Sequence, residues 1–108
     1  MIEATKDNFH ELVSEGVTLV DVWGTSCAPC MAMMPDVERF AEERSDDLKV
    51  VKLEAAKARR LMMELKLMGL PAFLLYRDGE EIGRLAGGDV TFDKMRSWVD
   101  DTLSSATV

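Results

Sequence analysis

Runs of apolar residues along the chain alternate with segments in which apolar positions recur at helical spacing. The runs are rich in Val and Leu, as is typical of strands covered on both faces, and they occupy residues 17–23, 48–53 and 72–76. The helical spacing predicts amphipathic helices. These helices extend over about residues 5–15, from the cysteines to about residue 44, over residues 57–67, and from residue 92 onward.

Short signals at the ends of these segments complete the set of elements. Thr5 and Thr91 are predicted helix N-caps. Residues 2–4 can form a short edge strand, and the Asp-Gly pair at 78–79 predicts a hairpin turn into a returning strand over residues 81–85.

The resulting order, βαβαβαββα, predicts a three-layer α/β fold with a central mixed sheet flanked by helices. No repeat or linker interrupts it, so we expect one domain over residues 1–108. Thirteen Lys and Arg against 20 Asp and Glu give a net charge of −7, which makes nucleic acid and anionic membranes poor partners. No apolar run approaches the roughly 18 residues of a membrane span. The first residues lack the basic and apolar regions of a signal peptide, so we expect a cytoplasmic protein.

The two cysteines of the chain, Cys27 and Cys30, lie three residues apart. Two thiols are too few for the disulfide scaffold of a small secreted domain. They are also too few for a complete zinc site within one chain, since the single histidine, His10, is distant. The pair lies between a predicted buried strand and a helix, which indicates redox chemistry. The alternative is a pair of inert small apolar residues.

A position at a helix N-terminus gives the two cysteines different chemistry. Residues three apart on a first helical turn share a face, so they can close a disulfide with little backbone movement. The positive end of the helix dipole stabilises a thiolate, so Cys27 should be the exposed nucleophile with a lowered pKa. Cys30, one turn further, should be buried and act as the resolving thiol. Pro29 fits because this turn tolerates a missing N–H and is stiffened by proline.

Several motifs around the cysteines follow one another in a familiar order. Leu-Val-Asp-Val-Trp at residues 19–23 precedes Ser-Cys-Ala-Pro-Cys at 26–30, and Gly-Leu-Pro-Ala follows at 69–72. With Pro35 in the second helix and Gly87 after the hairpin, the chain resembles the thioredoxin family over essentially its whole length. The resemblance implies a thioredoxin fold in which Pro35 bends the active-site helix.

The resemblance also implies roles for residues near the cysteines. Cys27 would attack substrate disulfides, Cys30 would resolve the mixed disulfide, and Asp21 would be the buried acid behind Cys30. On physical grounds, a carboxyl in a doubly covered strand has a raised pKa and can serve as a general base near neutrality. Lys52 matches the lysine that pairs with this acid. The alternative is a structural role, in which the carboxyl of Asp21 is simply paired with Lys52.

Further matches concern the surface that a substrate would touch. Pro71 matches a cis-proline facing the disulfide, which would leave the Leu70 backbone free to pair with an extended substrate segment. Trp23 matches a tryptophan beside the disulfide, and a core aromatic at a strand end is its alternative role. The expected substrate-binding residues are Trp23, Ser26, Ala28, Pro29, Met31, Leu70, Pro71 and Gly87.

Four departures from the family pattern fall at this surface. Ser26 replaces a tryptophan, Ala28 a glycine and Met31 a lysine. Residues 54–56, Glu-Ala-Ala, replace an acidic strand exit that ends in aspartate. Loss of the lysine should modestly raise the pKa of the thiolate, and the changed groove leaves the substrates and the reductase open.

Methionines and basic residues give two further signals. Helical spacing favours core packing for most of the eight methionines, and it leaves Met31 as the candidate for an adaptable docking contact. Lys57, Arg59 and Arg60 form a basic cluster, interpreted as a solvated helix face, with docking of an anionic partner as the alternative.

The interpretation that unites these features is a protein disulfide reductase and dithiol–disulfide electron carrier. We expect an electron donor of the thioredoxin-reductase kind, protein disulfides as substrates, a monomer, and no bound cofactor or metal. A disulfide oxidase or isomerase and a non-catalytic binding module are the alternatives, although Cys-Ala-Pro-Cys keeps the proline typical of reducing members. A further alternative is a metal or iron–sulfur site shared by two chains, each giving Cys27 and Cys30.

Overall fold

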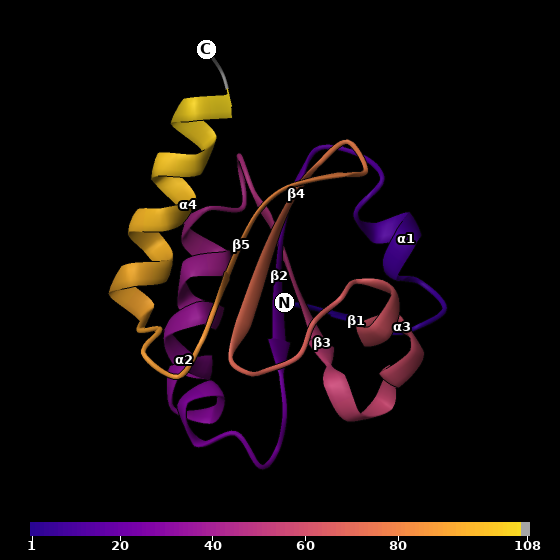
Figure 1. The fold of residues 1–108 in the computed structure, drawn as a ribbon. Coiled ribbons are helices and arrows are strands. Elements are labelled where there is room, and N and C mark those ends of the chain that lie inside the picture. The colour runs from indigo at the N-terminus through magenta and orange to yellow at the C-terminus, as the bar shows by residue number, and fades with distance from the viewer. Residues whose placement is uncertain (107–108) are drawn as a thin grey trace.

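A mixed sheet of five strands forms the centre of the computed structural model, which describes residues 1–106 (Figure 1). The strands lie in the order β1-β3-β2-β4-β5. β1, β3 and β2 run parallel, whereas β4 is antiparallel to both β2 and β5. Their bounds are Ile2–Ala4 (β1), Val17–Trp23 (β2), Lys49–Glu54 (β3), Ala72–Arg77 (β4) and Glu80–Ala86 (β5).

Helices cover both faces of this sheet (Figure 1). α1 (Phe9–Leu12) and α3 (Arg59–Glu64), with the 3₁₀ turn η1 (Ala55–Lys57), pack on one face. α2 (Ala28–Glu43) and α4 (Phe92–Ala106) pack on the other. The predicted order of elements and the three-layer α/β architecture are therefore confirmed. The last two residues of the predicted domain lie outside the described residues.

The alternation of side chains along β2 divides the interior into two apolar cores. Val20 and Val22 belong to the core under α1 and α3, whereas Leu19 packs with Met33 and Val37 of α2. Because alternate positions of a strand share a face, Asp21 lies on the same face as Leu19. The single acid of this strand therefore points to the side of the sheet that α2 covers.

The first helix is shorter than its predicted range of 5–15. Residues 6–8 form a turn instead, in which the N–H groups of Asp7 and Asn8 donate to Thr5 Oγ1 at 3.2 Å. The N–H of Phe9 donates to the Thr5 carbonyl oxygen at 3.0 Å. The N-cap of α1 is Asn8, so the prediction of Thr5 as the helix N-cap was wrong, and Thr5 caps the preceding turn. Gly16 has a φ of 72° and serves the loop into β2, because the helix has already ended.

The helix predicted over residues 57–67 is also shorter and is preceded by a separate turn. Ala58, with φ −140° and ψ 46°, separates η1 from α3. At the other end Lys66 adopts a φ of 58°. Its N–H donates to Met63 and that of Leu67 donates to Met62, which is the hydrogen-bond pattern of a Schellman motif. This ending is usually marked by glycine, so the lysine concealed it in the sequence.

The signals predicted after β4 are present. Asp78 and Gly79 have φ values of 49° and 87°, the positive pair that a type I′ hairpin requires. Thr91 Oγ1 accepts a hydrogen bond from the N–H of Lys94 at 3.2 Å and so caps α4. Pro35 lies inside α2, where the helix loses one backbone hydrogen bond.

Candidate active site

The two cysteines form a disulfide at the N-terminus of α2. β2 ends at Trp23, and after a short loop Cys27 takes the N-cap position, with 5.3 Å between the Cα atoms of Cys27 and Cys30. The N–H of Cys30 lies 3.3 Å from Cys27 Sγ, and that of Met31 donates to the Cys27 carbonyl oxygen at 3.1 Å. Cys27 is partly exposed, whereas Cys30 is 1% exposed. This difference in access is the one expected for an attacking and a resolving thiol.

The N-terminus of α2 is the positive group next to the sulfurs. The helix spans 16 residues, and its first turn contains no acidic side chain that would offset the dipole. Pro29 occupies this turn as predicted, and Met31 leaves it without a basic side chain. In the reduced state, a thiolate at Cys27 would be stabilised by this helix end and by the N–H of Cys30, which faces Cys27 Sγ.

Asp21 is buried in the middle of the sheet and is 2% exposed. Burial raises the pKa of its carboxyl from 3.8 to about 7, and the positive charge of Lys52 opposes this rise. Lys52 lies beside Asp21 in the pairing of β2 with β3, but no ion pair joins the two side chains in the part of the chain described. A buried carboxyl that titrates near neutrality can take up and release a proton at neutral pH, as a general base must.

Trp23 lies at the end of β2, between the acid and the active-site loop. Its ring centroid is 5.9 Å from Lys52 Nζ, within the range of a cation–π contact. The indole Nε1 is buried and has no hydrogen-bond partner within residues 1–106. Trp23 is partly exposed, so it is not a fully buried core aromatic.

The loop before β4 lies at the same end of the sheet. The peptide bond between Leu70 and Pro71 is cis, as the resemblance implied. Pro71 is buried, and its carbonyl oxygen accepts a hydrogen bond from the N–H of Gly87 at 3.1 Å. Gly87 has a φ of 128°, a conformation that favours glycine. Gly87 thus holds the Pro71 loop from the end of β5.

A groove of about 680 Å³ runs past the disulfide. It brings Cys27 together with four of the predicted contact residues, which are Ser26, Ala28, Pro29 and Leu70. The lining does not include the other four predicted contacts, which are Trp23, Met31, Pro71 and Gly87.

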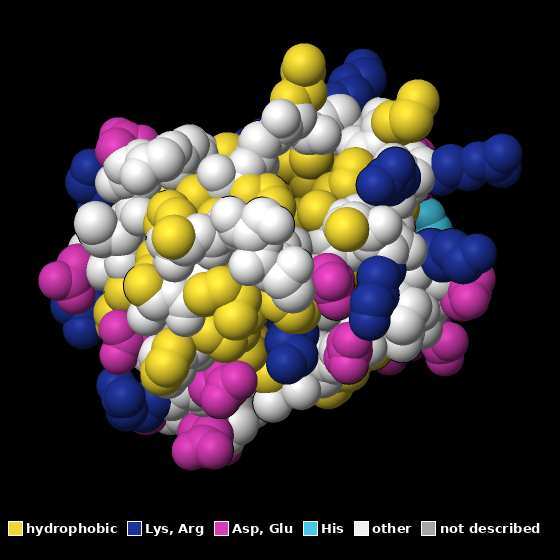
Figure 2. Space-filling model, turned by 90° about the horizontal axis from the view of Figure 1, so that it is seen from below, with side chains coloured by type: hydrophobic (Ala, Val, Ile, Leu, Met, Phe, Trp, Pro, Cys, Tyr) yellow, Lys and Arg dark blue, Asp and Glu magenta, His cyan; other side chains and the backbone are white. Residues whose placement is uncertain are grey.

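The lining also includes Gly24 and Thr25, which the sequence did not single out. Ala55 and Ala56 complete it, and they belong to the unusual strand exit at residues 54–56 that was expected at this surface. A Cβ at Gly24 would lie 3.0 Å from Leu70 Cδ1, so a larger residue there would require the Leu70 side chain to shift. Figure 2, a view from below, shows hydrophobic side chains spread across this end of the molecule.

The methionines divide between core and surface. Met33 and Met62 are packed in the cores at 8% and 9% exposure, and Met31 is 45% exposed. Met63 and Met68 are more exposed, at 77% and 99%. The prediction of Met31 as the surface methionine was therefore incomplete. α3 ends early, which leaves Met68 in the loop beyond it.

A family model described as Thioredoxin matches residues 1–101 of the chain. The chain belongs to the thioredoxin family. Thioredoxin from Acetoanaerobium sticklandii is 37% identical over 101 residues, which cover 92% of this chain and 96% of that relative. Thioredoxin from Peptoclostridium acidaminophilum is 34% identical over 101 residues, covering 92% of each chain. Thioredoxin X, chloroplastic, from Arabidopsis thaliana is 33% identical, over 98% of this chain and 60% of its own.

A solved structure shares the fold of this chain. Thioredoxin f2 from Chlamydomonas reinhardtii matches with a TM-score of 0.85 and 24% identity, over 94% of each chain. The likeness confirms the predicted thioredoxin fold. As a member of the thioredoxin family with a cysteine pair at disulfide distance, the chain is a thiol-disulfide oxidoreductase, and both facts support dithiol–disulfide reductase function.

Within residues 1–106 no group of three or more His, Cys, Asp or Glu side chains could hold a metal ion. In the same residues no helix has the length and apolar character needed to cross a membrane.

Proposed function

We propose that this thioredoxin-family chain reduces disulfides in protein substrates, with Cys27 as the attacking and Cys30 as the resolving cysteine. The Cys27 thiolate attacks one sulfur of the substrate disulfide, a bond forms between them, and the other substrate sulfur leaves as a thiolate. The Cys30 thiolate then attacks Cys27 Sγ, closes the internal disulfide and releases the second substrate thiolate. Two electrons have then passed from the chain to the substrate.

The observation that carries this assignment is the difference in access between the two sulfurs. Cys27 lines an open groove at the positive end of a helix, whereas Cys30 is 1% exposed. A substrate disulfide can therefore reach Cys27 alone, and Cys30 can attack only Cys27 Sγ once the mixed disulfide has formed.

Asp21 acts as the proton acceptor for Cys30 in this proposal. Its carboxyl has a pKa of about 7 and lies on the face of the sheet under α2, the helix that carries Cys30. The carboxylate accepts the proton of the Cys30 thiol, either directly or through one water molecule, as Cys30 attacks. Lys52, on the neighbouring strand, keeps the pKa of Asp21 lower than burial alone would.

The substrate segment lies in the groove between the active-site loop and Leu70. Ser26, Ala28 and Pro29 supply one side and Leu70 the other. The backbone of Leu70 would pair with an extended substrate segment as in strand addition. The other predicted contact residues lie outside the lining, where they shape its walls or contact a larger partner. They are Trp23, Met31, Pro71 and Gly87.

The remaining parts of the proposal concern the cellular setting. A reductase donor of the thioredoxin-reductase kind returns two electrons and two protons to the Cys27–Cys30 disulfide after each turnover. We place the chain in the cytoplasm, because thiols stay reduced there and a dithiol reductant can persist. It acts as a monomer, since all residues assigned a role come from one chain.

Turnover of insulin disulfides with dithiothreitol as the electron source tests this proposal. Both Cys27→Ser and Cys30→Ser should lower the protein-dependent rate by at least about a hundredfold, because each removes one of the two required sulfurs. The two variants are matched controls in a trapping assay. Cys30→Ser should accumulate a mixed disulfide with insulin, whereas Cys27→Ser should not. Trapping by Cys27→Ser alone would reverse the assigned roles, and full turnover by either variant would refute the mechanism.

A further inference from the structure

We infer that the groove at the disulfide continues into a second pocket on α3, and that this pocket selects substrates by an apolar side chain next to a carboxylate. The inference rests on the proposed function, because the occupant is the substrate segment that flanks the disulfide held at Cys27. It adds the class of substrate to that function.

The second pocket has a volume of about 340 Å³ and adjoins the groove. The two share Ala55, Ala56 and Leu70 as lining residues. The remaining lining is Arg59, Met62, Met63, Leu67, Met68 and Gly69. A chain crossing Leu70 from Cys27 therefore passes directly from one hollow into the other. The small side chains of the two alanines keep the passage open.

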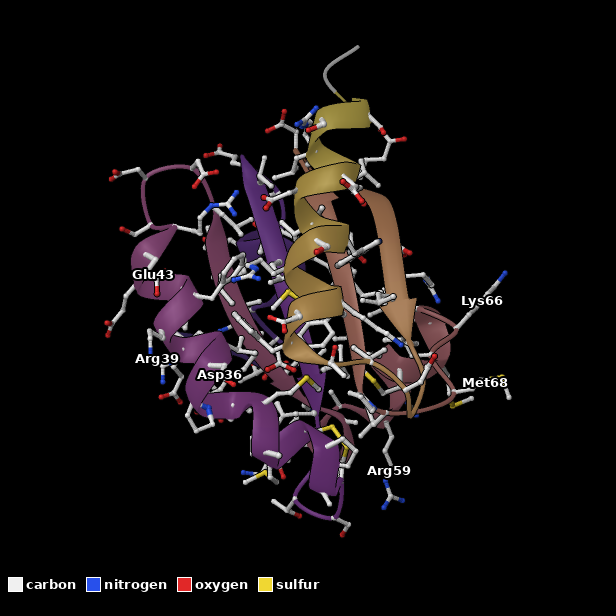
Figure 3. The ribbon with its side chains drawn as sticks, turned by 90° about the vertical axis from the view of Figure 1, so that its left-hand side faces the viewer. Asp36, Arg39, Glu43, Arg59, Lys66 and Met68 are labelled. Atoms are coloured by element: carbon white, nitrogen blue, oxygen red, sulfur yellow. A yellow bond between two sulfur atoms is a disulfide. The ribbon has the colours of Figure 1, made fainter. Side chains whose placement is uncertain are left out.

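The walls of the α3 pocket are apolar and adaptable. Met63 is 77% exposed and Met68 is 99% exposed, although both carry large apolar side chains. Figure 3 shows Met68 extending away from the body of the protein. Exposed apolar side chains grouped beside a groove are typical of an interaction site, and methionine adapts its shape to different partners. This lining favours an apolar substrate side chain.

The charge at the pocket is opposite to that of the whole chain. The chain carries a net charge of −7, yet Arg59 is the charged residue among those lining the groove and the α3 pocket. Within residues 1–106 Arg59 has no ion-pair or hydrogen-bond partner, whereas Lys57 is paired with Glu54 at 3.4 Å. In Figure 3 the Arg59 side chain points away from the protein, and in Figure 2 Lys and Arg side chains gather on one side of the apolar band.

Local stability does not account for this arginine. Arg59 is the first residue of α3, the end at which the helix dipole disfavours a cation. A guanidinium with free donors at the edge of an apolar pocket suits a carboxylate, which it can bind through two hydrogen bonds. The preferred substrate segment therefore carries Asp or Glu next to its apolar residue.

Peptides with a cysteine activated as a pyridyl disulfide provide a direct probe. Attack by Cys27 on the peptide sulfur releases pyridine-2-thione, which absorbs light, and attack by Cys30 then frees the peptide thiol. One peptide pair carries Leu-Glu-Glu before or after the cysteine, a second pair carries Leu-Lys-Lys, and a third carries Ser-Glu-Glu. A Gly-Ser peptide serves as the neutral reference. The rate constant of reduction by the fully reduced chain is measured at low salt, where exposed charges are screened least.

The expected result is a preference that depends on Arg59 and not on its neighbour. The Leu-Glu-Glu peptide should react roughly fivefold faster than Leu-Lys-Lys in at least one orientation, since exposed charge pairs contribute up to about 1 kcal/mol. Arg59→Glu should abolish or invert this preference. Arg60→Glu makes the same change of charge one residue further along α3, outside the pocket. This variant should keep most of the preference for the acidic peptide.

Met63→Ser tests the apolar half of the inference. It should slow the reaction of Leu-Glu-Glu more than that of Ser-Glu-Glu, which isolates the contact between the two side chains. The inference is overturned if the acidic and basic peptides react alike in both orientations, or if Arg59→Glu and Arg60→Glu behave alike. In those cases reduction of the Gly-Ser peptide leaves the proposed function standing. Failure to reduce even that peptide refutes the proposed function and the inference together.

Discussion

Asp21 is the residue at which burial and chemistry are most closely linked. The carboxyl sits in a strand covered on both faces, and burial raises its pKa to about 7 despite the charge of Lys52. The same burial that suits it to accept a proton from Cys30 makes its ionised form unfavourable in the folded state. Stability and activity should therefore respond in opposite ways when this carboxyl is removed.

Asp21→Asn is expected to stabilise the protein above about pH 7. The pKa of Asp21 is raised from 3.8 in the unfolded chain to about 7 in the folded one. The wild type therefore loses stability as the pH rises through this window, and the loss is complete above it. This shift corresponds to at most about 4 kcal/mol. Urea unfolding of the oxidised protein should show equal stabilities near pH 4 and a growing advantage of the variant up to pH 8.

The control for this prediction is Asp46→Asn, which removes an exposed carboxyl in the turn before β3. It should leave the curve of stability against pH close to that of the wild type. An advantage of Asp21→Asn that is the same at every pH would contradict a buried, titrating carboxylate as its cause.

The same substitution should slow the second chemical step. Asp21 is ionised above about pH 7, so the release of substrate by Cys30 should accelerate between pH 6 and pH 8 in the wild type. Asp21→Asn should lose this acceleration. At pH 8 its rate of substrate release should be lower than that of the wild type by on the order of tenfold or more, and at pH 6 the difference should be smaller. The rate of this second step is measured as the single-turnover release of thiol from a preformed Cys27 mixed disulfide. An unchanged pH profile would assign Asp21 a purely structural role.

Among the elements, α4 offers the clearest test of a local signal read from the sequence. Thr91 Oγ1 accepts a hydrogen bond from the N–H of Lys94 at the start of this helix. Thr91→Ala should lower the free energy of unfolding by about 1 kcal/mol, and Thr91→Ser, which keeps the hydroxyl, should lose much less. Equal stabilities of the two variants in urea unfolding would show that the cap does not support α4.

Strands and turns could be predicted because their signals are local. The apolar run at residues 17–23 corresponds to β2, and the Asp-Gly pair at 78–79 occupies the two positive-φ positions of its hairpin. The ends of the short helices could not be predicted in the same way. α3 ends at Glu64, and Lys66 shortly beyond it adopts a positive φ. Tertiary contacts support this ending, because the carbonyl oxygens of Leu65 and Lys66 accept hydrogen bonds from Arg84 of β5. No periodicity within the helix reports such a contact.

In the active site, too, some features could be predicted from the sequence and others could not. The cysteine pair, its place at a helix N-terminus and the buried acid follow from sequence, because motif and strand pattern determine them. The lining of the groove could not be predicted from the sequence, because it depends on how two loops meet. Gly24 and Leu70, which come into contact across it, are far apart in the chain. Gly87 lies outside the lining of the groove, and its N–H donates to the Pro71 carbonyl oxygen.

At the scale of the whole molecule, the fold places the chemistry at one end of the sheet. β2 leads into the disulfide, β3 leads into the alanines of the groove, and β4 begins just after the Leu70-Pro71 bond. Two apolar cores, one on each face, hold these elements in a fixed relation. The groove and the α3 pocket are therefore formed by loops and helix ends that these two cores support.

The central claim is that Cys27 and Cys30 work as a reducing dithiol, and a redox titration tests it most directly. The purified protein is equilibrated in dithiol–disulfide buffers of defined potential, and the free thiols are trapped and counted by mass. The account predicts one reversible two-electron transition near or below the cytosolic glutathione poise, roughly −220 to −320 mV. A markedly less negative midpoint would indicate an oxidase or isomerase, and the absence of any reversible transition would contradict a catalytic role for the pair.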